Sequence, residues 1–299
     1  MKIAAVVVTF NRKEYLVKNI EALLAQVNAP MDILIIDNAS TDGTEETIRH
    51  YMDAGQILYE NTGENLGGAG GFNFGIRRAY EAGYDAIWIM DDDTYPHPDA
   101  LEKFLQADKD LNGMYGYLAG KVLWKDGSWC EMNTPKYKGG MAEGKYKQIV
   151  QSSFVSMFIP RKSVATYGLP IKEFFIWGDD VEYTRRIALR EPSYLVEDSQ
   201  VLHDTKNNVG SNIVYDDERI DRYRYAYRNE MYIALHEGWK RRVYQQLKIW
   251  YHIAKILLKS SQKKRKIRLI LSASKEGKTF NPSIEYLESQ SPMAVRNLL

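Results

Sequence analysis

The sequence predicts an α/β protein with a mostly parallel central sheet flanked by helices, followed by a helical C-terminal segment. Three observations support this fold class. Apolar, β-branched runs alternate with segments of helical periodicity over residues 2–90. The runs lack polar alternation, which is typical of strands buried on both faces. Each run ends in polar or glycine residues, and parallel strands bring such ends to one edge of a sheet, where ligands bind.

The first elements have the clearest signals. KIAAVVVTF at 2–10 is a predicted buried strand. A helix is predicted over 11–26, because leucine and isoleucine recur at helical spacing and Asn11 can cap the start. Residues 31–40 predict a second strand, and residues 41–52 a helix with an acidic first turn.

The remaining elements are apolar or amphipathic stretches bounded by turn residues. They are a strand at 56–61, a glycine loop running into a helix at 67–83, a strand at 84–90, strands at 116–124 and 152–160 with a glycine- and lysine-rich connection at 136–147, a turn and helix at 173–191, and a strand at 193–204. Beyond Asp221, one or two aromatic, basic helices are predicted. The predicted organisation is a domain at 1–220, with halves at about 1–112 and 113–220, and a C-terminal segment at 221–299.

Composition narrows the class of protein. The chain has 299 residues, of which 44% are apolar and 12% aromatic, which excludes a disordered protein. Cys130 is the one cysteine, so no disulfide forms within the chain, and a reducing compartment is indicated. No window approaches the roughly 18 to 20 apolar residues of a membrane-spanning helix. We therefore expect a cytoplasmic protein, peripheral at the inner face of the cell membrane if it binds lipid.

Charge is distributed unevenly. Residues 238–275 contain 12 Lys and Arg and no Asp or Glu, whereas the rest of the chain is acidic. A basic, amphipathic segment of this kind predicts an anionic partner, and a membrane surface attracts it by about 1 kcal/mol per charge. The alternative is a helix packed on the body with a solvated basic face. Nucleic acid is not expected, because no recognition fold accompanies the basic segment.

Three adjacent carboxylates, Asp91, Asp92 and Asp93, follow an apolar run in AIWIMDDDT. They stay ionised near pH 7 only beside a counter-charge. A divalent cation supplies one, and alternating strand geometry lets Asp91 and Asp93 face the same ion. His203, at the end of another predicted strand, is a candidate third ligand if the fold brings it there. The alternative is a solvated acidic turn with His203 elsewhere.

A second acidic cluster lies in FIWGDDVEY, where Asp179 and Asp180 begin a predicted helix beside Trp177. Partial burial by Trp177 would raise the pKa of a free carboxyl toward the range of a general base. The alternative is a simple helix cap. Five glycines at 67–75 suit close approach of a phosphate-bearing ligand, but they match neither a dinucleotide fingerprint nor a P-loop.

Taken together, the segments VVVTFNR, IIDNASTDGT, NLGGAGGFNFG, MDDDT and FFIWGDDVEY resemble family 2 inverting glycosyltransferases with the GT-A fold, in order and spacing, over about residues 1–235. ENLGGAGGF, WGDDVEY, a late LHD and YRYAYRNEMYI are most similar to bacterial galactofuranosyltransferases and the neighbouring rhamnosyltransferases. The mycobacterial members are expected to be much longer, so polymerising behaviour is not implied.

The resemblance implies a role for each matching residue. The first half of the domain would bind the nucleotide sugar and the second half the acceptor. The implied donor-binding residues are Thr9, Asn11 and Arg12 along the nucleotide, Asp37 on the uracil N3–H, Asn65, Gly68 and Gly71 in the sugar-nucleotide pocket, and Asp92 facing ribose or sugar. Asp91, Asp93 and His203 would ligate Mn²⁺ or Mg²⁺ on the diphosphate.

On the acceptor side, the resemblance implies Asp180 as the catalytic base, Trp177 as a wall of the site and Asp179 as a sugar-binding residue. The implied function is a metal-dependent inverting transfer of galactofuranose from UDP-galactofuranose to a glycan or polyprenyl-diphosphate-linked acceptor, in cell-surface polysaccharide synthesis. The alternatives are a rhamnosyltransferase using dTDP-rhamnose, which Asp37 would not distinguish, and a catalytically silent sugar-nucleotide-binding assembly protein. A nucleotidyltransferase is a further alternative, but its basic glycine-rich loop after the first strand is absent here.

Overall fold

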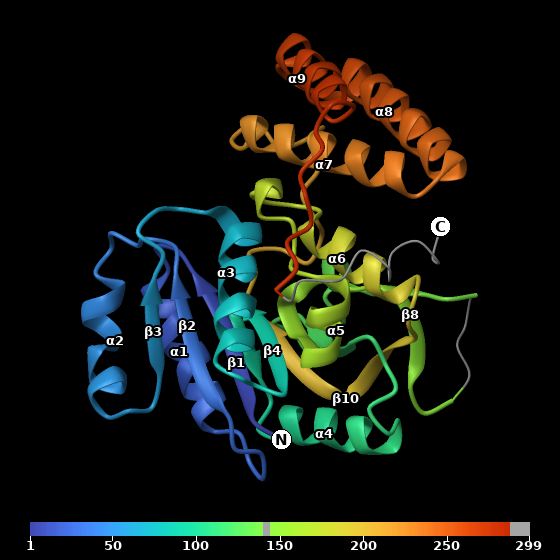
Figure 1. Ribbon diagram of the computed structural model, residues 1–299. Coiled ribbons are helices and arrows are strands. Elements are labelled where there is room, and N and C mark those ends of the chain that lie inside the picture. The colour runs from blue at the N-terminus through green and yellow to red at the C-terminus, as the bar shows by residue number, and fades with distance from the viewer. Residues whose placement is uncertain (140–143, 288–299) are drawn as a thin grey trace.

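The computed structural model describes residues 1–139 and 144–287. It shows an α/β body with a cluster of three helices at one end (Figure 1). The end of the predicted C-terminal segment, 288–299, and the middle of the predicted 136–147 connection lie outside the described residues.

The body contains the predicted strands and helices in the predicted order, together with helices at 100–110 and 161–167 and strands at 94–96, 136–137 and 147–151 that the sequence did not predict. The strands are β1 (Ile3–Thr9), β2 (Asp32–Asp37), β3 (Leu58–Asn61), β4 (Ala86–Asp91), β5 (Thr94–Pro96), β6 (Leu118–Leu123), β7 (Lys136–Tyr137), β8 (Lys147–Gln151), β9 (Met157–Pro160) and β10 (Ser193–His203). The α-helices are α1 (Lys13–Leu24), α2 (Thr44–Asp53), α3 (Gly67–Glu81), α4 (Ala100–Asp110), α5 (Arg161–Tyr167) and α6 (Asp179–Ala188). Short 3₁₀ turns include η1 (Glu131–Asn133) and η3 (Lys172–Phe174).

One mixed sheet joins these strands in the order β3-β2-β1-β4-β9-β6-β10-β8-β7, with β5 paired to β10. The first four strands in the chain are mutually parallel, and so are β6 and β10. In contrast, β9 runs antiparallel between β4 and β6. The prediction of a mostly parallel sheet is therefore confirmed for β1 to β4, and the antiparallel pairs involve β5 and the later strands.

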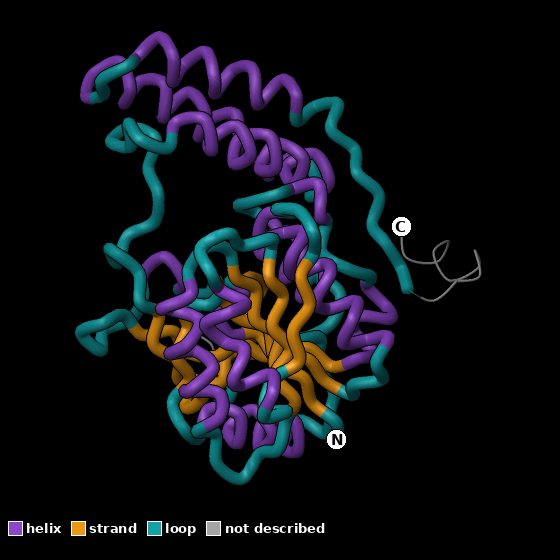
Figure 2. Tube along the Cα trace, turned by 90° about the vertical axis from the view of Figure 1, so that its left-hand side faces the viewer, coloured by secondary structure: helices purple, strands orange, loops and turns teal. Residues whose placement is uncertain are grey.

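Helices cover both faces of the sheet (Figure 2). All seven residues of β1 are buried. Alternate side chains of β1 point to opposite faces: Val7 packs in the core beneath α1, α2 and α4, and Val6 in the core beneath α3, α5 and α6. Burial on both faces explains why every residue of the strand before Thr9 is apolar.

Two details of the first half differ from the prediction. The glycine-rich stretch is helical from Gly67 onward, not a loop before a helix. A Cβ at Gly75 would lie 2.4 Å from Val6 Cγ1, so the later glycines let α3 approach the sheet closely. Asn11 does not cap α1: the capping position is Arg12, and the Asn11 side chain instead accepts a hydrogen bond from the Thr41 amide.

The C-terminal cluster contains α7 (Tyr223–His236), α8 (Trp239–Lys259) and α9 (Lys263–Glu276). The sequence predicted one or two helices in this segment. Isoleucines from α8 and α9 pack with tyrosines of α7 in a separate core. On its other side, α7 packs on the body, with Tyr232 against Phe174. The predicted boundary at residue 220 stays a prediction. Among the described residues, no helix combines the length and apolar character needed to cross a membrane.

Candidate functional site

The carboxyl ends of the parallel strands meet at one edge of the sheet. The strand register pairs Thr9 of β1 with Asp37 of β2, and Val8 with Asp91 of β4. Asn61 ends β3 beside Asp37. This edge is the end of the body that faces α7 (Figure 1). The prediction that the polar strand ends gather at one place is therefore confirmed.

Asp91, Asp93 and His203 lie together at this edge. One ligand atom from each residue falls within 4.8 Å of the other two. His203 reaches the site because β10 ends there, with β5 pairing its last residue to Thr94. His203 Nε2 lies 3.2 Å from Asp93 Oδ1. The predicted convergence of these three residues is confirmed.

Arg12 faces the crowded carboxylates with both of its terminal nitrogens. Arg12 Nη1 lies 3.2 Å from Asp92 Oδ1, and Arg12 Nη2 lies 2.7 Å from Asp93 Oδ2. The Thr9 hydroxyl donates to Asp92 at 2.8 Å. Asp92 is only 3% exposed, so its carboxylate orients Thr9 and Arg12 from below the site. Its predicted contact with donor ribose or sugar stays a prediction.

The cluster shifts the pKa values of its members in different directions. Burial, aided by the charge of Asp93, raises the pKa of Asp91 to about 6, and burial raises that of Asp92 to about 7. Burial also acts on Asp93, but its interactions with His203 and Arg12 outweigh this and lower its pKa. For His203, burial is outweighed by Asp93, Cys130 and Asp91, which raise its pKa to about 10.

These residues fit a divalent cation. Asp93 Oδ1 is buried and, apart from its ion-pair contact with His203 Nε2, makes no hydrogen bond within the described parts of the chain. Two carboxylates and one imidazole are a donor set suited to Mn²⁺ or Mg²⁺. Asn133 Oδ1 lies 2.8 Å from His203 Nδ1, which orients the ring with Nε2 toward Asp93. Sequence reasoning missed Asn133, because it lies in an irregular segment that carries no periodic or motif signal.

The second acidic pair begins α6 beside this cluster. Asp179 is 8% exposed, and burial together with the charges of Asp180 and Asp91 raises its pKa well above the ordinary value. Asp180 is half-buried, and burial with the charge of Asp91 raises its pKa to about 6. Neither carboxylate caps the helix, because Gly178 holds the capping position. A base with this pKa is mostly ionised at neutral pH.

An unusual backbone leads into that pair. Phe175, Trp177 and Gly178 all have positive φ angles, of 63°, 64° and 89°. Asn229 of α7, fully buried, holds the turn by donating to the carbonyls of Phe174, Ile176 and Trp177. The α7 helix thus helps to build the site, which the sequence analysis did not foresee. The Trp177 ring lies 5.0 Å from that of Tyr223 and remains half-buried.

The remaining predicted donor-binding residues line or support the strand-end surface. Asp37 is buried and accepts hydrogen bonds from the Ser40 amide and the Tyr59 hydroxyl. The Asn65 side chain accepts from the Gly67 amide, which shapes the start of α3. Open space surrounds Gly68, whereas a Cβ at Gly71 would clash with Val8. Gly71 is therefore a helix–sheet packing position, unlike the pocket-lining position expected for it.

Comparison with known sequences supports a transferase. The family model described as glycosyl transferase family 2 matches residues 4–160. The galactofuranosyltransferase GlfT1 of Mycobacterium tuberculosis is 27% identical over 269 residues, covering 81% of this chain and 85% of that protein. An alignment over so much of GlfT1 shows that the expected much greater length was wrong for this relative.

Solved structures share the fold. TarS of S. aureus, residues 1–349 in complex with UDP, has a TM-score of 0.59 at 14% identity, covering 94% of this chain and 73% of that chain. The chain spans 44% of the longer TarS structure. The mannosyltransferase PcManGT of Pyrobaculum calidifontis, in complex with GDP-Man and Mn²⁺, has a TM-score of 0.55 at 13% identity, covering 94% and 76%. The predicted GT-A fold is confirmed.

Proposed function

This chain belongs to glycosyl transferase family 2, and we propose that it is a metal-dependent, inverting enzyme that transfers galactofuranose from UDP-galactofuranose to a lipid-linked glycan. The observation that carries the mechanism is the placement of Asp180 beside the cluster of Asp91, Asp93 and His203. The family match favours a glycosyltransferase over a silent binding protein or a nucleotidyltransferase.

The chemistry follows from the positions of the chain's own groups. Asp180 accepts the proton of the acceptor hydroxyl. At the same time, the acceptor oxygen attacks the anomeric carbon of the donor sugar from the face opposite the nucleotide. The bond to the diphosphate oxygen breaks in the same displacement, which inverts the anomeric centre and releases UDP. Asp91, Asp93 and His203 would hold Mn²⁺ or Mg²⁺, whose charge stabilises the departing diphosphate. Asp179, with its raised pKa, can donate a hydrogen bond to a sugar hydroxyl.

The proposed identity of the donor is inferred from the similar proteins. GlfT1 is named a galactofuranosyltransferase, TarS is solved with UDP, and PcManGT with GDP-Man and Mn²⁺. The proposed partner of the base N3–H is Asp37, at the end of β2. Uracil and thymine share that edge, so dTDP-rhamnose is the second candidate donor. We propose that the enzyme acts in cell-surface polysaccharide assembly, at the cytoplasmic face of the membrane.

A panel of nucleotide sugars tests the donor. UDP-galactofuranose is expected to release nucleotide in the presence of acceptor, with turnover abolished by EDTA and restored by added Mn²⁺ or Mg²⁺. Nucleotide release is measured for UDP-galactofuranose, UDP-galactopyranose, UDP-glucose, GDP-mannose and dTDP-rhamnose under identical conditions. Turnover of dTDP-rhamnose with UDP-galactofuranose inert would replace the first donor by the second. Release of pyrophosphate instead of UDP would overturn the reaction class.

The outer face of α8 supports contact with a membrane. Leu247 is 65% exposed, Trp250 62% and Leu258 80%, and they recur at helical spacing. The other exposed apolar side chains of α8 are Trp239, Val243, Tyr244, Tyr251 and Leu257. No acidic residue interrupts this helix, and lysine and arginine lie among the apolar side chains. A contiguous apolar face of this kind marks an interaction surface, and its charge favours anionic lipid.

Replacing Leu247, Trp250 and Leu258 together by serine is expected to weaken binding to phosphatidylcholine–phosphatidylglycerol vesicles by about 100-fold or more, since each buried apolar side chain contributes about 1.5–3 kcal/mol. Sedimentation with vesicles measures the binding. The matched control replaces Met114 and Val209, two exposed apolar residues of the body, by serine and is expected to bind normally. Equal vesicle binding by the α8 variant and the control would exclude this surface.

A further inference from the structure

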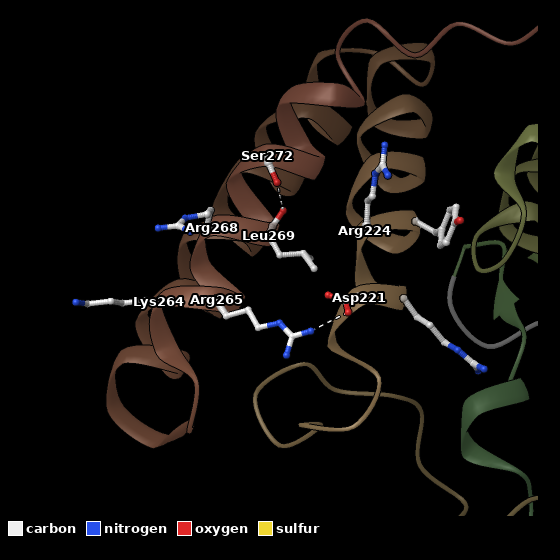
Figure 3. Close-up of a pocket in the computed structure, with 9 residues that line it drawn as sticks. Asp221, Arg224, Lys264, Arg265, Arg268, Leu269 and Ser272 are labelled. Carbon is white, nitrogen blue, oxygen red and sulfur yellow. Dashed lines mark hydrogen bonds and ion pairs between the residues drawn. The ribbon is translucent and has the colours of Figure 1, made fainter.

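A basic groove lies between α7 and α9, outside the site described above (Figure 3). Its volume is about 820 Å³. Its lining consists of Asp221, Arg222, Arg224 and Tyr225 from the α7 side and Lys264, Arg265, Arg268, Leu269 and Ser272 from α9. Five cationic side chains against one carboxylate give this lining a strong positive charge. The proposed reaction uses none of these residues.

The groove retains positive charge after its internal ion pairs are counted. Arg265 lies 2.7 Å from Asp221, and Arg224 lies 2.9 Å from Glu276. These two pairs join α7 and the turn before it to α9. Arg222, Lys264 and Arg268 are exposed and have no carboxylate within ion-pair distance in the part of the chain that the structure describes. Lys264 and Arg268 extend from α9 on the side away from α7 (Figure 3), so these two side chains would turn inward to contact an anion in the groove.

The shape of the groove suits a phosphate group attached to something larger. Arginine presents a planar fork that matches phosphate oxygens in pairs, and four of the five cations that line the groove are arginines. Leu269 points from α9 toward α7 and provides an apolar floor (Figure 3). A diphosphate that joins a glycan to a lipid carries one negative charge on each of its two phosphates, and cations from both walls of the groove can share these charges.

The groove also connects two surfaces that an acceptor must reach. On one side, the Tyr225 ring stacks on Phe175 at 4.9 Å, and Phe175 belongs to the turn that carries Trp177 and precedes Asp180. On the other side, α9 lies in the outer layer of the cluster together with α8 and its exposed apolar face (Figure 1). A diphosphate in the groove would therefore sit between the membrane-facing layer and the proposed acceptor site.

From this placement we propose that the α7–α9 groove binds the diphosphate that links the acceptor glycan to its lipid. The inference rests on the proposed function for the identity of the acceptor, and on the groove itself for the diphosphate. The lipid chain leaves toward the layer of α8 and α9, and the glycan passes Tyr225 and Phe175 to reach Asp180. The groove thereby holds the acceptor by its diphosphate and leaves the glycan free to react at Asp180.

The first test measures binding of inorganic pyrophosphate to the full chain by calorimetry, with EDTA present so that no metal retains it at the donor site. The groove variant carries Arg222→Gln, Lys264→Gln and Arg268→Gln, none of which breaks an ion pair between the helices. Its affinity is expected to fall by at least about tenfold, through loss of charge-assisted hydrogen bonds. The control variant carries Lys240→Gln, Lys259→Gln and Lys275→Gln, with the same change in charge on the same segment, and keeps its affinity.

Equal affinity of the groove variant and the wild type, or equal losses in both variants, would overturn the site. A second arm identifies the source of the diphosphate. Phosphatidylcholine vesicles containing polyprenyl diphosphate are expected to bind the wild type more tightly than vesicles of equal charge containing phosphatidylserine, and the groove variant is expected to lose this preference. Pyrophosphate binding without any vesicle preference would overturn the lipid assignment. Donor turnover is measured separately, so failure here with UDP release intact leaves the proposed reaction standing.

Discussion

Replacing Asp180 by asparagine is expected to lower kcat for sugar transfer by about 10²–10⁴-fold, which is the usual loss on removing a general base. Asparagine keeps the size of the side chain and its contact with the Val181 amide, but it accepts no proton. Binding of UDP in the presence of Mn²⁺ is expected to remain within a few-fold, because that site is built by the strand ends. UDP release measures turnover, and calorimetry measures nucleotide binding.

The pH profile gives an independent readout of the same group. A base acts when ionised, so kcat/KM is expected to fall as pH decreases through about 6, the raised pKa of Asp180. The profile is recorded at saturating Mn²⁺, because the pKa of Asp91 also lies at about 6 before a metal binds. The control is Asp179→Asn, which is expected to change KM for the acceptor more than kcat. Full turnover by Asp180→Asn would assign the base elsewhere.

Much of the first half of the fold could be predicted because its signals are local. A strand such as β1, buried on both faces, is apolar at every position before Thr9, and the next strand in the chain, β2, is also its neighbour in the sheet. Polar residues at the ends of parallel strands then converge without further information. The gathering of Asp91 and Asp93 near Asp37 follows from this rule alone.

Other parts of the site depend on contacts between distant segments, which no periodicity reveals. Arg12 and Asp93 lie 81 residues apart in sequence, and Asn133 reaches His203 over 70. Asn229 holds the turn before α6 from a helix that composition assigned to a separate segment. Asparagine side chains that pin a backbone carry no sequence signal of their own, because the same residue is common in any turn.

The glycine-rich stretch shows how one composition serves two purposes. The glycine content predicts a loop for close ligand approach, and the space around Gly68 is open. Gly71 and Gly75 instead face β1, where Val8 and Val6 would be too close to any side chain. Both uses depend on the missing Cβ, so spacing along the sequence could not separate them.

The metal cluster provides the last expectation, through Asp91→Asn. Removing one ligand is expected to lower kcat by about 10³-fold or more, given the several kcal/mol that metal ions contribute to such transition states. Without metal, the same substitution is expected to stabilise the folded chain. The pKa of Asp91 is raised in the folded state, so its ionisation opposes folding above the ordinary Asp range, and the penalty is complete above about pH 6.

At pH 7.5 in EDTA, Asp91→Asn is therefore expected to melt at a higher Tm than the wild type, because the substitution removes this penalty. In Mn²⁺ the order reverses, since ion binding stabilises the wild type and has little effect on the variant. Asp53→Asn, an exposed carboxylate on α2, is the charge-matched control and is expected to behave as wild type in both buffers. An equal Mn²⁺-dependent rise in Tm for Asp91→Asn and wild type would show that the ion binds elsewhere, because a site built from Asp91, Asp93 and His203 cannot lose a ligand without losing affinity.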